Sequence, residues 1–329
     1  MKVAVLNFAH GHADGYLRHL HGIAGVEVGA CDPEGFRQAE SLAEAGSPGG
    51  TVFFGTYEEA AEWADAVVVC SENAKHREIV EVAIAAGCAV LCEKPLATNL
   101  EDARAMRHAA AAASVPLMVA FPVRFSPAFA TLRERVATGA LGDILGIVGT
   151  NNGKIPRDRS WFTDPALSGG GSIVDHVVHC ADLIDALIPQ RAVSVIATSN
   201  RILHPHVATD VETSGLVSIE YDSGIIATID CSWSQPESAS SWGGLTLEVT
   251  GTRGSVKIAP FAPHVGGYDA GGETWLPYGS DLDAAMIDEF VSAAAAGTQP
   301  QPDADVGVRT VAIMSAALES ARTGSVVKL

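Results

Sequence analysis

The first residue of this sequence with a clear chemical interpretation is a lysine at the end of an apolar run. Glu93, Lys94 and Pro95 directly follow residues 87–92, which have the composition of a buried strand. In open α/β sheets, the carboxyl ends of the strands border the crevice that holds ligands, and a proline there ends the strand ladder. The sequence therefore predicts that Lys94 presents an ammonium group to a bound ligand.

A carboxylate and an imidazole form a second candidate pair further along the chain. Asp175 and His179 are four residues apart in a predicted helix that is entered through the triple glycine 169–171, so their side chains share one face. A carboxylate bonded to an imidazole fixes its tautomer and raises its basicity, as a general base requires. The alternative is an ordinary surface pair. His176 competes for either role, but it points about 100° away on the helix.

The first 120 residues contain the repeating pattern that could position Lys94. Short apolar runs alternate with segments of helical spacing, which predicts a parallel sheet covered on both faces, with all carboxyl ends at one edge. The predicted strands are Val3–Leu6, Val26–Cys31, Val52–Phe54, Ala66–Cys70, Ala89–Cys92 and Leu117–Ala120. The predicted helices are Ala13–His21, Glu34–Ala45, Tyr57–Trp63, Lys75–Ala86 and Leu100–Ala113.

The pattern changes after Phe121, which predicts two domains. Residues 1–121 are predicted to form an α/β domain, and residues 122–329 an α+β domain with an antiparallel or mixed sheet. The final helices could pack back on the first domain. The predicted strands are Ile144–Asn151, Val193–Thr198, Thr213–Tyr221, Gly224–Ser232, Leu245–Thr250 and Ser255–Ile258. The predicted helices are Ser126–Thr138, Gly169–Ile188, Leu282–Ala296 and Val306–Thr323.

The turn after the first strand is a degenerate dinucleotide-binding motif. Where G-x-G-x-x-G is expected, the chain reads Asn7 to His12, and only the small Ala9 allows close approach of a pyrophosphate. Asp32 ends the second strand, where a carboxylate accepts ribose hydroxyls and repels a 2′-phosphate. NAD is therefore favoured over NADP. The predicted contacts of this turn and strand are Phe8, Ala9, His10, Gly11, His12 and Asp32.

A second group of candidate cofactor contacts follows the fourth strand. Ser71, Glu72 and Asn73 stand at the same sheet edge as Lys94, and His76 falls in the first turn of the next helix. Read alone, Asn73 and His76 are ordinary residues of a helix start. Their position predicts a role on the nicotinamide side.

Histidines near the first turn raise the question of a metal site. His10 and His12 form a His-x-His pair, with His19 and His21 nearby. No carboxylate or cysteine completes a familiar ligand spacing around them, so the sequence predicts no metal.

Composition restricts the partners and the compartment. The formal charge of 21 − 39 = −18 disfavours binding to nucleic acid. The six cysteines lie mostly in apolar runs without a C-x-x-C pair, which predicts buried free thiols in a reducing compartment. The apolar run at the start of the chain is too short for the core of a signal peptide. No apolar run approaches about 18 residues, the length that a membrane-spanning helix needs. We expect a cytoplasmic protein without a membrane partner.

Two longer stretches resemble a known family. CSENAKHREIVEVAIAAGCAVLCEKPLA (70–97) and GGGSIVDHVVHCADL (169–183) are similar to the Gfo/Idh/MocA oxidoreductases. The likeness covers essentially the whole chain and includes FPVRFSPAFATLRERVATGALGDI (121–144). It departs from the family at the degenerate turn and at Glu72, where proline is common.

The resemblance implies a fold and an activity. It implies that residues 1–121 form a dinucleotide-binding Rossmann domain. It implies that residues 122–329 form a domain for substrate binding and oligomerisation, whose large, open, mostly antiparallel sheet packs against a neighbouring subunit. It also implies an NAD(P)-dependent reaction at a sugar or cyclitol alcohol or ketone. It assigns Lys94 to the reacting oxygen, with Asp175 nearby, and His179 to the hydroxyl proton. It places Glu93 at the nicotinamide ribose and Arg124 near the active-site floor. Both therefore join the predicted cofactor contacts, as does Lys94.

The substrate residues are predicted from polarity and position. Lys94, Asp175, His176 and His179 are expected to touch the substrate together with Asn152 and Trp161, in a cleft between the domains. For Trp161 the alternative is simple packing between domains. Asn151, Lys154 and Arg157 share its polar stretch, and further candidates are His204, His206 and Trp233.

Three functional hypotheses remain open. The first is a dehydrogenase or ketone reductase acting on a sugar or polyol. The second is a lyase or glycosidase that retains and recycles NAD. The third is a non-catalytic, NAD-binding regulatory protein. The strands of the second domain alternate in polarity, so one sheet face is expected to form a homodimer or homotetramer interface.

Overall fold

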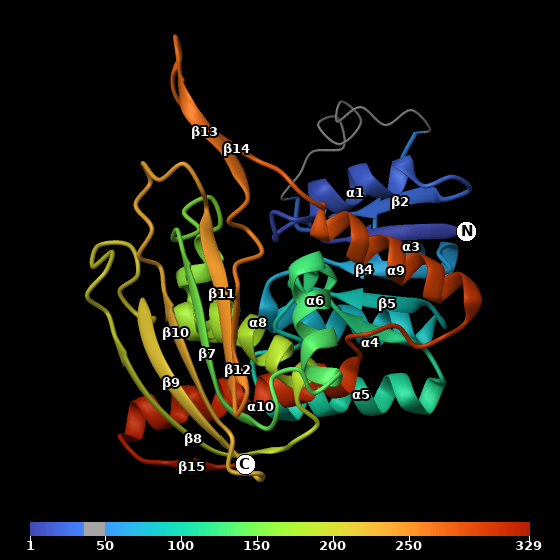
Figure 1. Cartoon of the computed structure of the whole chain (residues 1–329). Helices are drawn as coiled ribbons and strands as arrows, with labels where there is room; N and C mark the ends of the chain where they lie inside the picture. Colours follow the sequence, from blue (N-terminus) through green and yellow to red (C-terminus); the bar gives the residue numbers. More distant parts are fainter. Residues whose placement is uncertain (36–49) are drawn as a thin grey trace. The chain divides into compact units, whose positions relative to one another are not determined.

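The computed structural model describes residues 1–35 and 50–329, which form two units (Figure 1). The first unit contains Met1–Pro122, Ala166–Gly169 and Asp283–Val311. The second contains Val123–Pro165, Gly170–Leu282 and Ala312–Leu329. The chain therefore returns to the first unit near its end. The predicted helix Glu34–Ala45 lies outside the described residues beyond its first two positions.

The first unit is built on a six-stranded parallel sheet, as the sequence predicted. Its order is β3-β2-β1-β4-β5-β6, so the direction of chain progression reverses between β1 and β4, where open α/β sheets bind ligands. The strands are β1 (Lys2–Leu6), β2 (Glu27–Cys31), β3 (Val52–Phe54), β4 (Ala66–Val69), β5 (Ala89–Cys92) and β6 (Leu117–Val119). The helices are α1 (Ala13–Gly22), α3 (Tyr57–Trp63), α4 (His76–Ala85), α5 (Leu100–Ala113) and α9 (Leu282–Ala296), with the short 3-10 turn η1 (Asn73–Lys75).

Strand composition explains why this sheet forms. All four residues of β4 and of β5 are buried, as expected for short Val- and Ala-rich strands covered on both faces. The outer strand β6 is covered by residues near the chain end, because Val119 donates its backbone N–H to the carbonyl of Pro302 at 2.9 Å. This contact satisfies backbone groups that an edge strand would otherwise expose.

The second unit contains a seven-stranded mixed sheet, of order β12-β11-β7-β10-β9-β8-β15. Only β10 and β7 run parallel, so the sheet is mostly antiparallel, as predicted. The strands are β7 (Ile144–Gly153), β8 (Ala192–Asn200), β9 (Ser214–Tyr221), β10 (Ile226–Ser232), β11 (Gly243–Gly251), β12 (Gly254–Ile258) and β15 (Val327–Lys328). The hairpin β13 (His264–Asp269) and β14 (Gly272–Pro277), like β15, was not predicted.

One face of this sheet is covered by helices, and the core lies between them and the strands. The helices of the second unit are α6 (Pro127–Ala137), α8 (Ser172–Leu187) and the later part of α10 (Ala304–Thr323). Three further short helical turns are η2 (Pro122–Phe125), η3 (Ser160–Thr163) and α7 (Pro165–Ser168). Val177 and Ile184 of α8 are fully buried with Val217 and Ile229 of the sheet. None of the helices in the two described ranges is both long and apolar enough to cross a membrane.

The start of α8 differs from the prediction. The helix begins at Ser172 and not at Gly169, because the three glycines form a separate connection after α7. The carboxylate of Glu212 accepts the backbone N–H groups of Gly171 and Ile173, each at 2.9 Å, and so satisfies donors that a helix start leaves open. A Cβ at Gly171 would lie 1.9 Å from the carbonyl oxygen of Glu212. Only glycine allows this approach.

We predict that Gly171→Ala lowers the free energy of unfolding by at least about 3 kcal/mol, since the backbone of Glu212 must move and the helix start loses its cap. The matched control is Gly15→Ala in α1, where a Cβ meets nothing within 4 Å. That substitution should be neutral or stabilising by about 0.5–1 kcal/mol. Urea unfolding measures both, and equal stabilities of the two variants would contradict the steric argument.

Candidate active site

The lysine and glutamate of the Glu93–Pro95 segment lie directly after β5 and are almost fully buried. The exposed fraction is 1% for Glu93 and 6% for Lys94. The backbone N–H of Lys94 donates to Oε2 of Glu93 at 3.1 Å. Nδ1 of His76 lies 2.9 Å from the carbonyl oxygen of Pro95, and burial lowers the pKa of this imidazole. A neutral His76 that donates through Nδ1 therefore holds the backbone just after Lys94.

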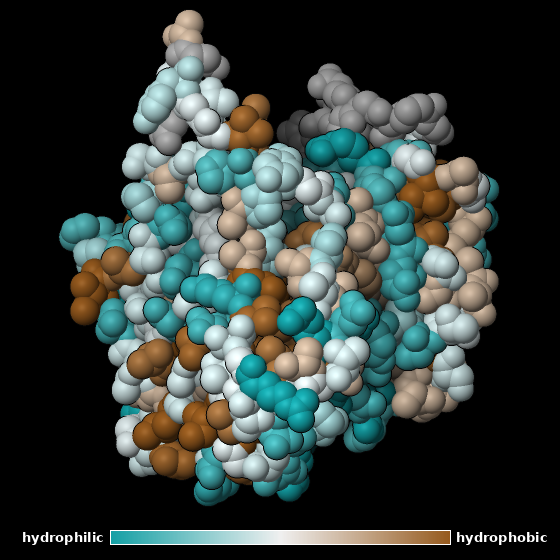
Figure 2. All heavy atoms as spheres, in the orientation of Figure 1, coloured by the Kyte–Doolittle hydropathy of each residue, from teal (hydrophilic) through white to brown (hydrophobic). Residues whose placement is uncertain are grey.

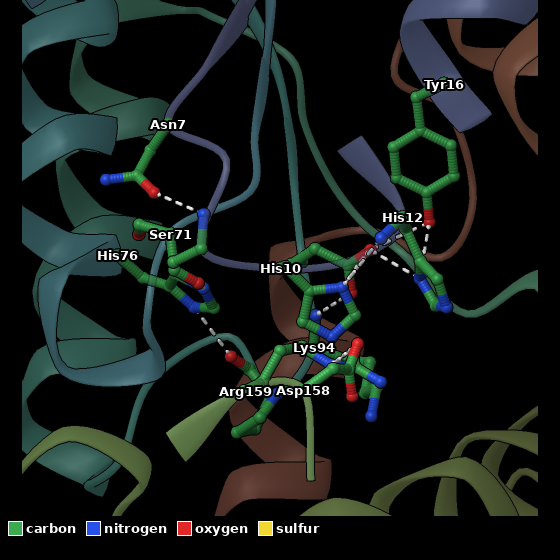
Figure 3. Close-up of polar contacts among 12 residues, drawn as sticks. Asn7, His10, His12, Tyr16, Ser71, His76, Lys94, Asp158 and Arg159 are labelled. Carbon is green, nitrogen blue, oxygen red and sulfur yellow. Dashed lines mark hydrogen bonds and ion pairs between the residues drawn. The ribbon is translucent and has the colours of Figure 1, made fainter. Parts of the chain in front are cut away.

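His10 and His12 of the turn after β1 lie close to Tyr16 of α1 (Figure 3). All three side chains lie near the other carboxylate oxygen of Glu93. The hydroxyl of Tyr16 donates to Oε1 at 2.8 Å. Nδ1 of His12 lies 2.9 Å from the same oxygen, and Nδ1 of His10 lies 3.6 Å from it. The side chain of His12 is 38% exposed, whereas that of His10 is buried. We call His10, His12, Tyr16 and Glu93 the Glu93 cluster.

The charges of the Glu93 cluster follow from these contacts. Burial would raise the pKa of Glu93, but the nearby His10 and His12 outweigh burial and hold that pKa well below its usual range. Burial would lower the pKa of His12, but the carboxylate of Glu93 outweighs it and the net pKa is raised. Burial and Glu93 together raise the pKa of Tyr16. The cluster therefore contains a carboxylate, an imidazole that gains a proton readily and a neutral phenol donor.

The turn after β1 contains a residue in the left-handed region, although it lacks the glycines of the motif. Asn7 has φ of 69°, in the left-handed region that glycine normally occupies and that asparagine tolerates better than most residues. Its side-chain oxygen accepts the N–H of Ala9 at 2.8 Å. The N–H of His10 donates to the carbonyl of Cys70 at 2.9 Å, which ties the turn to the end of β4. Asn7 therefore supplies the left-handed conformation at the position where the motif has its first glycine.

The side-chain amide of Asn7 also reaches the segment after β2. It donates to Glu34 at 3.0 Å and to the hydroxyl oxygen of Tyr57 at 2.9 Å. The hydroxyl of Tyr57 in turn donates to the same carboxylate oxygen of Glu34. Glu34 follows Asp32 by two residues, so two carboxylates stand after β2.

The residues after β4 present buried acceptors. Oε1 of Glu72 lies 3.3 Å from Nζ of Lys75, while its Oε2 has no hydrogen-bond partner among residues 1–35 and 50–329. The amide of Asn73 donates to the carbonyl of Ser168 at 2.9 Å, and its side-chain oxygen is likewise unpaired in this described part. The hydroxyl of Ser71 donates to the carbonyl of Glu72 at 3.2 Å. Buried acceptors of this kind match the hydroxyl donors of a ribose.

In the second unit, Asp175 is held by two partners that the sequence did not assign to it. The indole N–H of Trp233 donates to Oδ2 of Asp175 at 3.0 Å, and Nε2 of His176 lies 3.1 Å from the same oxygen. Trp233 is itself held through its carbonyl by Nε2 of His204 at 2.7 Å. The expectation that His176 points away from Asp175 was wrong, because adjacent side chains at a helix start can turn toward each other. The predicted pairing of Asp175 with His179, one turn later, stays a prediction.

The polar stretch after β7 is tied to neighbouring parts of the second unit. Asn152 accepts the hydroxyl of Ser232 at 2.9 Å, and Asn151 donates to the carbonyl of His176 at 3.3 Å. Nζ of Lys154 donates to the carbonyls of Glu237 and Ala239, and Arg157 pairs with the Glu237 carboxylate. Trp161 is buried with its ring 4.1 Å from that of Phe162.

Arg124 has a structural contact that sequence reasoning did not anticipate. Its guanidinium binds the buried Asp182 of α8 through Nη2 at 2.6 Å and Nε at 3.2 Å. This ion pair fixes η2 against α8. The predicted role of Arg124 at the cofactor remains a prediction.

Tyr16 and Glu212 are the site-supporting residues that the sequence interpretation missed. Tyr16 follows His12 by four residues at the start of α1, and this helical spacing was a usable signal. Glu212 had no local signal, since it reaches Gly171 from 41 residues away.

The absence of a carboxylate at close spacing had also argued against a metal near His10 and His12. The fold brings Glu93 to both imidazoles from 81 residues beyond His12.

Comparison with known proteins identifies the two halves of the chain. Residues 8–121 match the oxidoreductase family with an NAD-binding Rossmann fold, and residues 129–257 match the GFO/IDH/MocA C-terminal domain. The chain is 31% identical over 268 residues to the myo-inositol dehydrogenase Hyg17 of Streptomyces leeuwenhoekii, covering 78% of this chain and 76% of that protein. It is 31% identical over 277 residues to the 1,5-anhydro-D-fructose reductase of Ensifer adhaerens, covering 80% of each.

Solved structures agree with this assignment. GenD2 from gentamicin A biosynthesis, in complex with NAD, gives a TM-score of 0.88 at 27% identity and covers 100% of this chain and 96% of that one. The myo-inositol 2-dehydrogenase of Lactobacillus plantarum gives a TM-score of 0.85 at 25% identity and covers 100% and 99%.

The Glu93 cluster generates a prediction about pH. Because folding raises the pKa of His12, its contribution to stability is complete below the ordinary value of 6.5 and is lost as the pH rises through the raised pKa. Folding lowers the pKa of Glu93, so its contribution is present above 4.5 and is lost as the pH falls through the lowered pKa. The free energy of unfolding should therefore be higher for wild type than for His12→Ala. This difference should be larger at about pH 5.5 than at about pH 9.

Urea unfolding in buffer with a chelator measures this difference. The control is His19→Ala, since His19 pairs with Asp288 outside the Glu93 cluster. Equal differences at the two pH values would show that His12 gains no charge from its contact with Glu93.

Proposed function

The chain belongs to the Gfo/Idh/MocA family of NAD-dependent oxidoreductases, and from this premise we propose that it transfers hydride between NAD and a sugar, cyclitol or related polyhydroxylated compound. The reacting group is a secondary alcohol in one direction and a ketone in the other. The observation that carries the proposal is the buried Glu93–Lys94 pair at the ligand edge of a Rossmann sheet. The relatives named as a myo-inositol dehydrogenase and a 1,5-anhydro-D-fructose reductase support the substrate class.

The residues of the first unit fit NAD. Asn7 gives the turn its left-handed residue, and Ala9 leaves room beside it for a pyrophosphate. The carboxylate of Asp32 suits the hydroxyls of the adenosine ribose, and Glu34 adds negative charge against a 2′-phosphate. We propose that Ser71, Glu72, Asn73 and Glu93 contact the nicotinamide half, where the unpaired oxygens of Glu72 and Asn73 would accept ribose hydroxyls.

Three residues have separate roles in the proposed reaction. When bound, NAD would supply the hydride acceptor for oxidation, and its reduced form would supply the hydride donor for reduction. Lys94 supplies an ammonium group that stabilises the negative charge on the reacting oxygen. His179 accepts the hydroxyl proton in oxidation and returns it in reduction. Asp175 would orient the imidazole of His179, which accepts the proton. The contacts from Trp233 and His176 keep the carboxylate of Asp175 in one position.

The substrate contacts are proposed from the polar groups of the second unit. Asn152 and His176 offer hydrogen-bonding groups near the start of α8, and Trp161 offers an aromatic face of the kind that packs against a sugar ring. Lys154 and Arg157 hold the loop of residues 234–242 and are assigned to shaping this region.

The compartment and the oligomeric state are also part of the proposal. We place the protein in the cytoplasm, since its six cysteines are free and buried, as expected in a reducing compartment. On the sheet of the second unit, Val148, Ile196, Leu216 and Ile226 point away from the helix-covered core and are each about half exposed. Hydrophobic surface gathers over strands β8 to β10, at the lower left of Figure 2. We propose that this face forms a homodimer or homotetramer interface.

The reaction is tested with purified protein, NAD and a panel of inositols and sugars, with reduced nicotinamide absorbance as the signal. We expect Lys94→Ala to lower kcat/KM by at least about 1000-fold and His179→Ala by about 100- to 10,000-fold. The control is Lys257→Ala on β12, an exposed lysine of the second unit that should retain full activity. Wild-type activity in Lys94→Ala would refute the role of Lys94. Product formed without net NADH would instead indicate a lyase that recycles NAD.

The interface is tested by light scattering. Leu216→Lys combined with Ile226→Lys should reduce the mass toward that of one chain, because two charges would be buried at the interface. Ile202→Lys, at an exposed loop position, is the control and should leave the mass unchanged. A wild-type protein with the mass of a single chain would exclude the proposed interface.

A further inference from the structure

We propose that His10, His12 and Glu93 form a binding site for a divalent transition-metal ion, with Zn²⁺ the best match. The proposal goes beyond the oxidoreductase activity, and it rests on the position, chemistry and accessibility of these three side chains.

The three side chains have the spacing of ligands around one ion. One ligand atom from each lies within 4.8 Å of the other two. Nδ1 of His10 and Nδ1 of His12 face the same carboxylate oxygen of Glu93, at 3.6 and 2.9 Å. Tetrahedral zinc with bonds of about 2.0–2.1 Å separates neighbouring ligand atoms by about 3.3 Å. The observed distances of 3.6 and 2.9 Å lie on either side of that value. An ion at Nδ1 of His10 would replace its contact with the backbone N–H of His12, which lies 3.4 Å away.

The chemistry of the ligands selects the metal class. Two imidazoles and one carboxylate form a ligand set that zinc uses when it keeps its fourth position open. Mg²⁺ and Ca²⁺ prefer oxygen ligands and are disfavoured here. The hydroxyl of Tyr16 lies 2.8 Å from Oε1 of Glu93 and 3.2 Å from Nδ1 of His12, within reach of the ion or of a water on it.

The surroundings support the ligands and leave a path for the ion. Oε2 of Glu93 is held by the backbone N–H of Lys94, which fixes the orientation of the carboxylate, as second-shell contacts do in metal sites. Glu93 and His10 are buried, but His12 is 38% exposed and offers access from solvent. Binding replaces the proton that His12 shares with Glu93 by the metal ion, and that proton leaves to solvent.

The site has a consequence for turnover that rests on the proposed function. Glu93 is the carboxylate assigned there to the nicotinamide ribose. Because the backbone N–H of Lys94 already binds Oε2, a zinc ion on Oε1 would compete with the ribose hydroxyls for that oxygen. Zinc and NAD would therefore exclude each other, and zinc would inhibit the oxidoreductase.

Calorimetric titration of chelator-treated full-length protein with ZnCl₂ tests the site without any turnover. We expect one zinc per chain, with affinity reduced at least tenfold in His12→Ala and in Glu93→Gln and unchanged in the control His19→Ala. Thermal unfolding shows whether each variant is folded. If Glu93→Gln fails to fold, the variant of the partly exposed His12 decides. Absence of zinc binding to wild type, or unchanged affinity in His12→Ala, would overturn the proposal.

Two further measurements complete the test. Co²⁺ bound at this site should give the visible absorption of a tetrahedral ion in wild type and lose it in His12→Ala. Saturating NAD should weaken zinc at least tenfold. Unchanged zinc affinity in NAD would refute mutual exclusion, whereas failure to bind NAD at all would count against the proposed function and leave the zinc titration as the test of the metal site.

Discussion

The ligand-binding edge of the sheet in the first unit depends on the contacts of one buried carboxylate, that of Glu93. Removing an ionised carboxylate from water costs several kcal/mol unless charged and hydrogen-bonding partners replace the water. Here the partners come from three places: Tyr16 on α1, His12 and His10 in the turn after β1, and the backbone of Lys94. The same contacts that stabilise the charge therefore join the end of β5 to the turn after β1. The position of Lys94 follows, because its own backbone is one of the donors.

The second unit also buries polar groups that need hydrogen-bonding partners, at the start of α8. This helix is buried on nearly all sides, yet its first turn contains polar groups. Glu212 satisfies the helix N–H groups, and Trp233 and His176 satisfy Asp175. Because the glycine at position 171 lets the backbone of Glu212 approach, the cap and the close packing depend on each other. In both units, buried polar groups fix the backbone that carries the candidate catalytic residues.

Much of the fold followed from local patterns, and the exceptions have physical reasons. Fully apolar runs such as Ala66–Val69 predicted the strands well, because they are short and rich in β-branched valine, which indicates a buried strand where periodicity alone does not. The hairpin Gly272–Pro277 with its partner strand is largely exposed and has no such signal. Motif matching judged Asn7 by its residue type, whereas the turn requires a left-handed backbone that asparagine also adopts. The Glu93 cluster depends on contacts across 81 residues, which no local spacing shows.

The unpaired acceptors after β4 connect stability with ligand binding. A buried oxygen without a donor costs about 1–3 kcal/mol, and a folded chain retains such groups where something other than the protein supplies the donor. Oε2 of Glu72 and Oδ1 of Asn73 are two such oxygens within the described ranges, and both follow the strand that flanks the switch point of the sheet. Ribose hydroxyls would satisfy both at once. Glu72 would then add one hydrogen bond to the cofactor and would make this edge more stable with NAD than without it.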